Sequence, residues 1–217
     1  MRVIKELEMK TCGLYVAKMS AKRAAKWRDL AMSVELDHKP SIGKLYGKEV
    51  FQPRDVTFFS DESKGYWYSR KLAKSKPLHR WMKDIIKWVN KKFSTGYNGV
   101  LINRYYTKKD GTRKDSIGKH IDNERDLDPV GVVGIAFGAA CVFRIRKKTG
   151  DKKINGKNFL DVKLSDSDVF VMSGNFQTHY THEIPVMSAR SIKNDIANGD
   201  NGETFIRTSL TFRKHLK

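Results

Sequence analysis

The stretch VVGIAFGAACVFRIR (Val132–Arg146) indicates the fold class of this chain, because β-branched and aromatic residues dominate it and such residues favour strands. Similar β-prone runs, separated by turns, make up the chain from Gly99 onward: GVLINRYY (99–106), NFLDVKL (158–164), DVFVMSG (168–174), THYTHEIP (178–185) and TFIRTSLTFR (204–213). No helical pattern separates these runs, which disfavours parallel α/β winding. The strands must therefore be antiparallel and cover one another as a barrel or double sheet, and we predict a jelly roll.

Two helices are predicted ahead of these strands. Ser20 can cap the first helix, whose apolar positions follow a spacing of three to four residues: Ala24, Trp27, Leu30, Ala31 and Val34. The second helix has Pro77 in its first turn, stops at Thr95-Gly96 and carries a stripe of apolar residues: Trp81, Ile85, Trp88 and Val89. We expect the tryptophans in the core and the helices as buttresses of the jelly roll.

The segment between the helices, residues 40–69, is expected to be irregular, because its aromatic residues lack helical order and are mixed with Gly and Pro. The polar loops TKKDGTRKDS (107–116) and SIKNDIANGDNGE (191–203) are expected to be hairpin connections. A chain of 217 residues is long enough for one domain and short for two. We predict one α+β, mainly β, domain over 1–217, with helices and the irregular segment in 1–98 and the jelly-roll core in 99–217.

The charge of the chain indicates a polyanionic partner. Lys and Arg number 43 against 24 acidic residues, which gives a formal net charge of +19, and a field of this sign attracts nucleic acid. A solvated lysine-rich surface is the alternative, since the basic residues are scattered. Cys12 and Cys141 lie far apart without a C-x-x-C motif, which indicates neither a disulfide scaffold nor a structural zinc site.

Membrane association is not expected. The start MRVIKELEMK lacks the apolar segment that a signal peptide carries. The longest apolar run, Val130–Phe143, is interrupted by small residues and is too short to span a bilayer. We expect a soluble, intracellular monomer in the cytoplasm or nucleus. The compact chain would suit a viral or microbial source.

A candidate metal site centres on the run GKHIDNERD (118–126). His120 and Asp122 are separated by one residue, so the alternation of a strand or its mouth puts them on the same side. A third candidate ligand lies in QTHYTHEIP (177–185), which contains His179 and His182. Two histidines and one carboxylate form the facial triad that binds Fe(II) and leaves three positions for a bidentate cosubstrate and dioxygen.

Spacing alone favours an alternative, in which His182 is an ordinary strand-end histidine and His120 a loop histidine. The C-terminal run RTSLTFRKH (207–215) shifts the balance. Arg207 and Arg213 are six residues apart, so on one strand they face the same side, and two inward guanidinium groups in an apolar strand require anions. A dicarboxylate cosubstrate would supply these anions.

Four motifs, NRYY, KHIDNE, THEIP and RTSLTFR, stand in the order and approximate spacing of the AlkB-like family of Fe(II)/2-oxoglutarate dioxygenases, which reverse alkylation damage in nucleic acid. The chain resembles this family from about Leu45 to Arg213. PRDVTFF followed by YWYS, and GVLINRYY leading into DSIGKHIDNERDL, look most like members that act on double-stranded DNA. The resemblance implies a double-stranded β-helix (jelly roll), a nucleotide-recognition lid, and Fe(II), 2-oxoglutarate and O2 as cofactors.

The resemblance assigns the metal ligands. His120, Asp122 and His182 match the family's iron-binding residues, and they would form the catalytic centre. His179 stays outside the triad.

The resemblance also assigns a 2-oxoglutarate pocket made of Asn103, Tyr105, Arg207, Ser209 and Arg213. Arg207 would pair with the distal carboxylate through its planar fork, and Arg213 would lie near the metal-bound end. Asn103 and Tyr105 would line the pocket. Ser209 stands where the family often has Asn, so the polar contact at this position is shortened or lost.

Substrate contacts implied by the resemblance are Leu45, Tyr46, Arg54, Tyr66, Tyr68, Ser69 and Glu124. Within the lid, Tyr68 would stack on the flipped base, with Tyr66 and Ser69 lining the pocket. Arg54 would contact the nucleic-acid strand.

Two further contacts have open alternatives. Leu45-Tyr46-Gly47 stands where double-strand-specific relatives carry an apolar finger, so Tyr46 would fill the vacated stack, or would be a packed loop residue. Glu124 would accept a hydrogen bond from the exocyclic amine of the base, or would be a surface carboxylate paired with Arg125 or a nearby lysine.

The predicted function is oxidative demethylation of 1-methyladenine and 3-methylcytosine in DNA, and by extension in RNA, with release of formaldehyde, succinate and CO2. Within enzymes, the alternative is another 2-oxoglutarate oxygenase that acts on an RNA mark or a protein. From a different class, the alternative is a catalytically silent module that binds nucleic acid.

Overall fold

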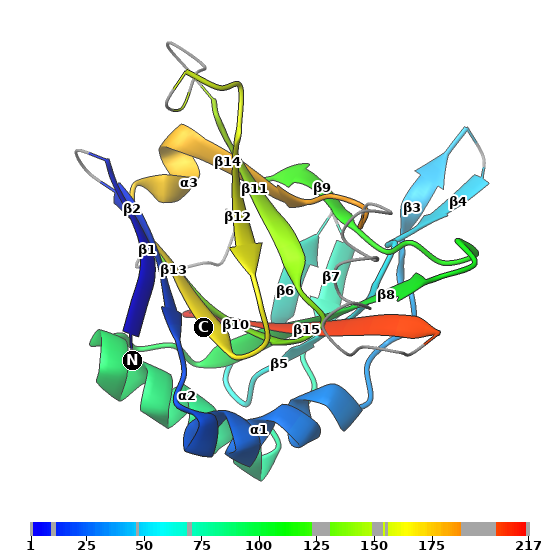
Figure 1. Cartoon of the computed structure of the whole chain (residues 1–217). Helices are drawn as coiled ribbons and strands as arrows, with labels where there is room; N and C mark the ends of the chain where they lie inside the picture. The colour runs from blue at the N-terminus through cyan, green and yellow to red at the C-terminus, as the bar shows by residue number, and fades with distance from the viewer. Residues whose placement is uncertain are drawn as a thin grey trace.

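The computed structural model describes residues 2–9, 12–46, 48–68, 71–122, 131–148, 154, 156–187 and 203–215. Two antiparallel sheets face each other, and helices α1 (Ala21–Ser33) and α2 (Arg80–Phe93) cover the outer face of the larger sheet (Figure 1). None of the helices in these residues is long and apolar enough to cross a membrane. The predicted jelly roll is confirmed.

The larger sheet has seven strands in the order β1-β2-β13-β10-β15-β8-β5. Their bounds are β1 Arg2–Met9, β2 Cys12–Lys18, β5 Asp55–Phe59, β8 Gly99–Lys108, β10 Val132–Gly138, β13 Asp168–Gly174 and β15 Thr204–Arg213. The smaller sheet, in the order β12-β11-β14-β9, comprises β9 Ile117–His120, β11 Cys141–Lys147, β12 Leu160–Leu164 and β14 Tyr180–Ile184. Two hairpins, β3 (Ser41–Leu45) with β4 (Lys48–Phe51) and β6 (Gly65–Tyr68) with β7 (Lys71–Lys74), and the short helix α3 (Phe176–His179) complete the fold.

Alternation along the strands separates two apolar cores. In β10, Val133, Ile135 and Phe137 pack in an outer core beneath the helices, whereas Val132 and Ala136 belong to an inner core between the sheets. Successive strand residues point to opposite faces, so one strand serves both cores. The inner core surrounds the site described below.

Both predicted helices are present, but α1 differs from expectation in two details. It follows Ser20, whose side chain makes no capping hydrogen bond. Trp27 and Ala31 are buried as predicted, whereas Leu30 is 44% exposed. Leu30 lies about 100° around the helix from Ala31, which brings it to the solvent edge.

Helix α2 begins later than predicted. Lys76 pairs with β5 through an isolated bridge, and the amide of Leu78 donates to Asp61, so the chain stays extended through Pro77 and the helix starts at Arg80. The helix ends at Phe93 because Ser94 adopts a left-handed conformation with φ of 53°. Its buried residues include Ile85 and Val89, while Trp81 and Trp88 are only partly buried against the outer core.

Two expectations about connectivity are wrong. The segment 40–69 is not irregular, since it contains β3, β4, β5 and β6. A division at residue 98 does not separate helices from barrel, because β1, β2 and β5 belong to the larger sheet. Both wrong expectations concern pairing with strands far along the chain, which a local pattern does not show. The loop 107–116 does turn back as a hairpin: Thr107 pairs with Lys114 in an antiparallel bridge, and the amide of Lys108 donates to the carbonyl oxygen of Arg113 over 2.8 Å. Residues 191–202 of the second predicted hairpin connection lie outside the described residues.

Candidate functional site

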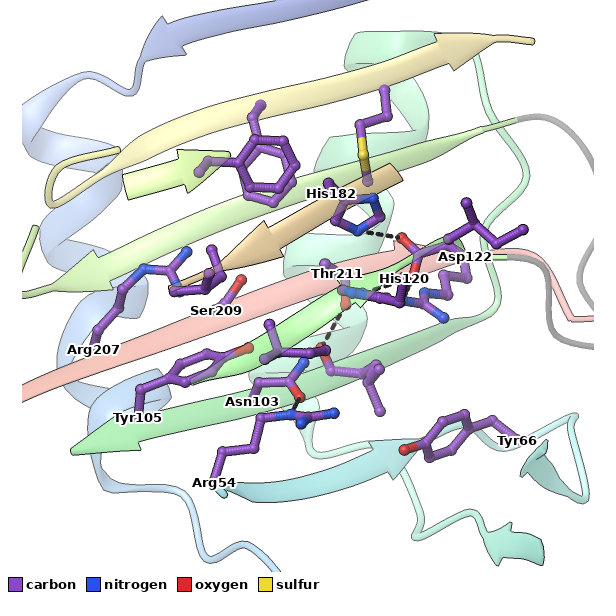
Figure 2. Close-up of a pocket in the computed structure, with 18 residues that line it drawn as sticks. Arg54, Tyr66, Asn103, Tyr105, His120, Asp122, His182, Arg207, Ser209 and Thr211 are labelled. Carbon is purple, nitrogen blue, oxygen red and sulfur yellow. Dashed lines mark hydrogen bonds and ion pairs between the residues drawn. The ribbon is translucent and has the colours of Figure 1, made fainter. Parts of the chain in front are cut away.

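Three side chains converge at the open edge of the smaller sheet. Pairing of β9 with β14 sets His120 directly opposite His182, and Asp122 follows two residues after His120. One carboxylate oxygen of Asp122 lies 3.6 Å from Nε2 of His182, and the other lies 3.9 Å from Nε2 of His120. The ligand atoms of all three lie within 4.8 Å of one another. Figure 2 shows the three side chains pointing toward a common point. Two imidazole nitrogens and a carboxylate in this arrangement fit a divalent iron ion.

Neighbouring groups hold these side chains in place. Nδ1 of His120 lies 2.8 Å from the carbonyl oxygen of Gly118, which leaves Nε2 directed at the site. The ring of Phe143 stacks on His182 at 5.2 Å between centroids. The amide of Asp122 donates to the side-chain oxygen of Gln177 over 3.0 Å. Such outer contacts orient metal ligands. Phe143 and Gln177 were not predicted, because nothing in their local sequence distinguishes them from core or loop residues.

Burial and charge set the protonation of the three groups. Burial lowers the pKa of His182 to about 3 and the pKa of His120 below its usual value. Both imidazoles are therefore neutral near pH 7, the form that binds a metal. Burial acts to raise the pKa of Asp122, but Arg213, with Nη2 only 2.7 Å from its carboxylate, and the two histidines hold that pKa below its usual value.

A cavity of about 320 Å³ extends from the three side chains along β8 and β15. The odd-numbered residues of these strands line it: Leu101, Asn103 and Tyr105 from β8, and Arg207, Ser209, Thr211 and Arg213 from β15. Even-numbered neighbours such as Leu210 and Phe212 face the outer core instead. The structure thus places Arg207 and Arg213 on the same side, as their spacing predicts.

Arg207 lies at the opposite end of this row of side chains from the histidines (Figure 2). It is 4% exposed, and its Nε and Nη1 have no hydrogen-bond partner among the described residues. Its guanidinium lies 5.4 Å from the ring centre of Tyr105, and burial raises the pKa of that tyrosine, so its hydroxyl stays neutral and able to donate. A buried cation with unused donors fits the carboxylate of a small ligand.

Arg54 is placed differently from the prediction. It is 2% exposed, lines the cavity, and its Nε donates to Oδ1 of Asn103 over 2.7 Å. Pairing of β5 with β8 sets Val56 opposite Asn103 and so draws Arg54 beneath the cavity. This position does not support the expected contact with a nucleic-acid strand.

The predicted substrate residues divide into three groups. Tyr66 is buried and lines the cavity from the side of β6. Tyr46 is 96% exposed at the tip of the β3–β4 hairpin, with a left-handed φ of 48°. Ser69 and Glu124, and the side chains of Leu45 and Tyr68, lie outside what the structure describes.

The fold and the site together define a class of protein. The profile of the 2OG-Fe(II) oxygenase superfamily matches residues 14–213. The chain therefore belongs to this superfamily, and it is an Fe(II)- and 2-oxoglutarate-dependent dioxygenase. Fe(II), 2-oxoglutarate and O2 are confirmed as its expected cofactors.

Its curated relatives include the DNA oxidative demethylase ALKBH2 of Homo sapiens, 31% identical over 80% of this chain and 60% of that protein. The ALKBH2 proteins of Mus musculus and Bos taurus are 28% and 29% identical, each over 80% of this chain and over 66% and 57% of their own lengths. The match thus spans about three fifths to two thirds of each relative. These relatives confirm the expected AlkB-like family.

A solved structure titled "The structure of OsALKBH1" shares the fold. Its TM-score is 0.57, at 16% identity, over 97% of this chain and 100% of that chain. At this identity the likeness supports the fold alone.

Proposed function

We propose that this chain demethylates nucleic acid by oxidation, with 1-methyladenine and 3-methylcytosine in DNA as its substrates. The observation that carries the proposal is the buried group of His120, Asp122 and His182 at one end of a cavity whose other end is the unsatisfied guanidinium of Arg207. The name of the ALKBH2 relatives and the net charge of +19 support a nucleic-acid substrate.

Each group of residues has a defined task in this proposal. The three ligands would hold Fe(II), which supplies the oxidation of the methyl group by O2 with 2-oxoglutarate as the second reductant. Arg207 would bind the distal carboxylate of 2-oxoglutarate. The apolar walls, including Leu101 and Phe143, exclude water from the reacting groups.

The overall reaction balances without a further cosubstrate. One atom of O2 goes into succinate as 2-oxoglutarate loses CO2, and the other goes into the methyl group. The hydroxylated methyl group then leaves the cationic base as formaldehyde. The C–N bond breaks with its electron pair remaining on the ring nitrogen, and the hydroxyl proton is released, because N1 of adenine and N3 of cytosine carry no proton in the unmodified base.

Access to the base requires a change in the nucleic acid. A methyl group on a Watson–Crick nitrogen is inaccessible in a duplex, so the base must be flipped out or presented on a single strand. Tyr66 offers a wall for a base that enters the cavity. Tyr46 would wedge into the stack that the base leaves, and its exposure on the hairpin supports this role.

Succinate and formaldehyde release from a methylated oligonucleotide tests the proposal. With Fe(II) and 2-oxoglutarate present, the wild type is expected to form both products in equal amounts, and His120→Ala is expected to form neither. His179→Ala is the matched control, because His179 is an exposed histidine outside the triad, and it should keep its activity.

Two outcomes would favour the alternatives. Binding of the oligonucleotide without product from the wild type would indicate a silent binding module. Succinate release stimulated by RNA or by a protein, but not by methylated DNA, would indicate a different substrate. Single-stranded and duplex DNA and RNA are therefore compared side by side.

A further inference from the structure

Helices α1 and α2 present a strongly basic surface. Nine of their 27 residues are Lys or Arg and two are acidic, compared with 43 Lys and Arg among 217 residues in the whole chain. Seven of these basic residues, all exposed, are here called the basic helix face: Lys22, Arg23, Lys26, Arg80, Lys83, Lys87 and Lys91.

The spacing in α2 gathers the charges on one side. Arg80, Lys83, Lys87 and Lys91 are three or four residues apart, so they form a stripe opposite the buried residues such as Ile85 and Val89. Like charges at this spacing repel one another. A bound polyanion would remove that repulsion.

Acidic residues neutralise little of this face. Lys26 pairs with Asp84 at 3.4 Å and Lys83 with Asp61 at 2.8 Å, and all four side chains are largely exposed. Exposed pairs are weak, so phosphate can replace the carboxylates. For Lys22, Arg80, Lys87 and Lys91, no carboxylate of the described residues lies within 4.0 Å.

An aromatic residue lies within the same face. The guanidinium of Arg23 lies 5.0 Å from the ring centre of Trp88, which also packs on Trp27 at 5.6 Å. This cation–π contact joins α1 to α2 within the basic helix face, and it keeps the charged group of Arg23 at the surface.

The basic helix face lies behind the active site. The helices cover the outer face of the seven-stranded sheet (Figure 1), whereas the cavity is lined by residues of its inner face. In β15, Leu210 packs toward the helices while Ser209 and Thr211 line the cavity. Because duplex DNA is stiff over such short lengths, a segment engaged at the cavity cannot also reach the helices.

We propose that the basic helix face binds the phosphate backbone of a second segment of duplex DNA, without regard to sequence or methylation. The protein would then hold one segment at the helices while the cavity samples bases on another. This binding does not depend on the proposed demethylation, since it uses none of the residues of the cavity.

The test compares two triple variants with the same change in charge. The helix variant is Arg80→Glu with Lys87→Glu and Lys91→Glu. The control is Lys108→Glu with Lys157→Glu and Lys163→Glu, three exposed lysines of the barrel.

Affinity for an unmethylated duplex is measured by fluorescence anisotropy between 50 and 200 mM salt. The slope of the logarithm of the binding constant against the logarithm of the salt concentration counts the phosphates that the protein neutralises. Relative to the wild type, the magnitude of this slope is expected to fall by about two to three in the helix variant and by less than one in the control.

Bridging of DNA provides a second readout. Wild-type protein bound to an immobilised duplex is expected to capture a labelled second duplex, and the helix variant is expected to lose this capture. Equal losses of salt dependence in the two variants, or unchanged capture by the helix variant, would overturn the proposal. Circular dichroism checks folding, and if the glutamate variant is unfolded, Arg80→Gln with Lys87→Gln and Lys91→Gln takes its place.

Demethylation of a five-nucleotide methylated strand is measured in the same proteins. The helix variant should act on it within about twofold of the wild type, because so short a strand cannot span both faces. Absence of demethylation in the wild type would refute the proposed function, while the duplex measurements would still decide the role of the helices.

Discussion

Arg213 and Asp122 form a buried ion pair at the edge of the metal site. The donor–acceptor distance is 2.7 Å, and both side chains are almost inaccessible to solvent. Asp122 must stay ionised to bind iron, and burial without a cation opposes this ionisation. Arg213 therefore keeps the ligand charged before a metal arrives.

Replacement of Arg213 tests this role. Arg213→Met is expected to lower the unfolding free energy of the metal-free protein by about 3–5 kcal/mol, because it leaves a buried carboxylate without its partner. A divalent cation should restore part of the loss. Urea denaturation with and without Mn²⁺ measures both effects. Arg144→Met, which breaks a more exposed pair with Asp161, is the control and should cost about 0–1 kcal/mol; an equal loss in both variants would contradict the assignment.

Arg207 belongs to the same strand but has a different task. Arg207→Met is expected to raise the KM for 2-oxoglutarate by about 10- to 100-fold, the equivalent of one or two charged hydrogen bonds. Arg207→Lys should recover only part, because an ammonium group cannot form the two parallel hydrogen bonds of a guanidinium. Initial rates at varied 2-oxoglutarate measure this effect. A KM unchanged in both variants would refute the pairing with the cosubstrate.

At the scale of elements, the hairpin β3–β4 projects from the body of the protein (Figure 1), and Tyr46 between its two strands is almost fully exposed. Tyr46→Ala is expected to reduce demethylation of a duplex by about tenfold or more, the loss of roughly one stacked base, and to leave a single-stranded substrate nearly unaffected. Parallel assays on the two substrates measure the ratio. Equal losses on both would count against the wedge, and Phe51→Ala, at the exposed end of the same hairpin, controls for general disturbance.

Asp166 joins the turn before β13 to two other elements. Its carboxylate accepts hydrogen bonds from the amide of Gly138 at 2.7 Å and from Nε of Arg28 in α1 at 3.1 Å. Burial acts to raise the pKa of Asp166, but these donors and Ser167 lower it below the usual 3.8. A carboxyl whose pKa is lowered by folding contributes stability above its unfolded pKa and loses it as the pH falls.

Asp166→Asn is therefore expected to lower the unfolding free energy at pH 7 by about 1 kcal/mol, a value reduced by the partial exposure of the pair with Arg28. The difference between wild type and variant should shrink as the pH falls below about 4. Denaturation curves at several pH values measure it. A difference that is constant from pH 7 to pH 3 would show that the charge is not involved.

At the scale of the whole molecule, the outer core stabilises the fold but contributes none of its described residues to the lining of the cavity. Ile85 of α2 is fully buried in that core, whereas the cavity is lined by the inner faces of the strands. Ile85→Ala is expected to lower the unfolding free energy by about 2–5 kcal/mol. The KM for 2-oxoglutarate should stay within about twofold when measured below the unfolding transition. A large change in KM at unchanged stability would contradict this separation of the two cores.

Features that depend on local pattern were predictable from the sequence. The apolar spacing indicated both helices, and β-prone runs indicated the strands around the site. The period of two placed Arg207 and Arg213 on one face of one strand. The choice of metal ligands came from residue chemistry and from resemblance to a family, and the structure brings all three together.

Features that depend on distant pairing were decided only by the tertiary structure. β5 became a barrel strand because β8, some forty residues later, offers it a partner, and this pairing buried Arg54 beside Asn103. Gln177 and Phe143 acquired their roles because the two sheets face each other. The physical reason is that alternation and propensity act over a few residues, whereas strand pairing and burial are determined by contacts between segments that the sequence separates widely.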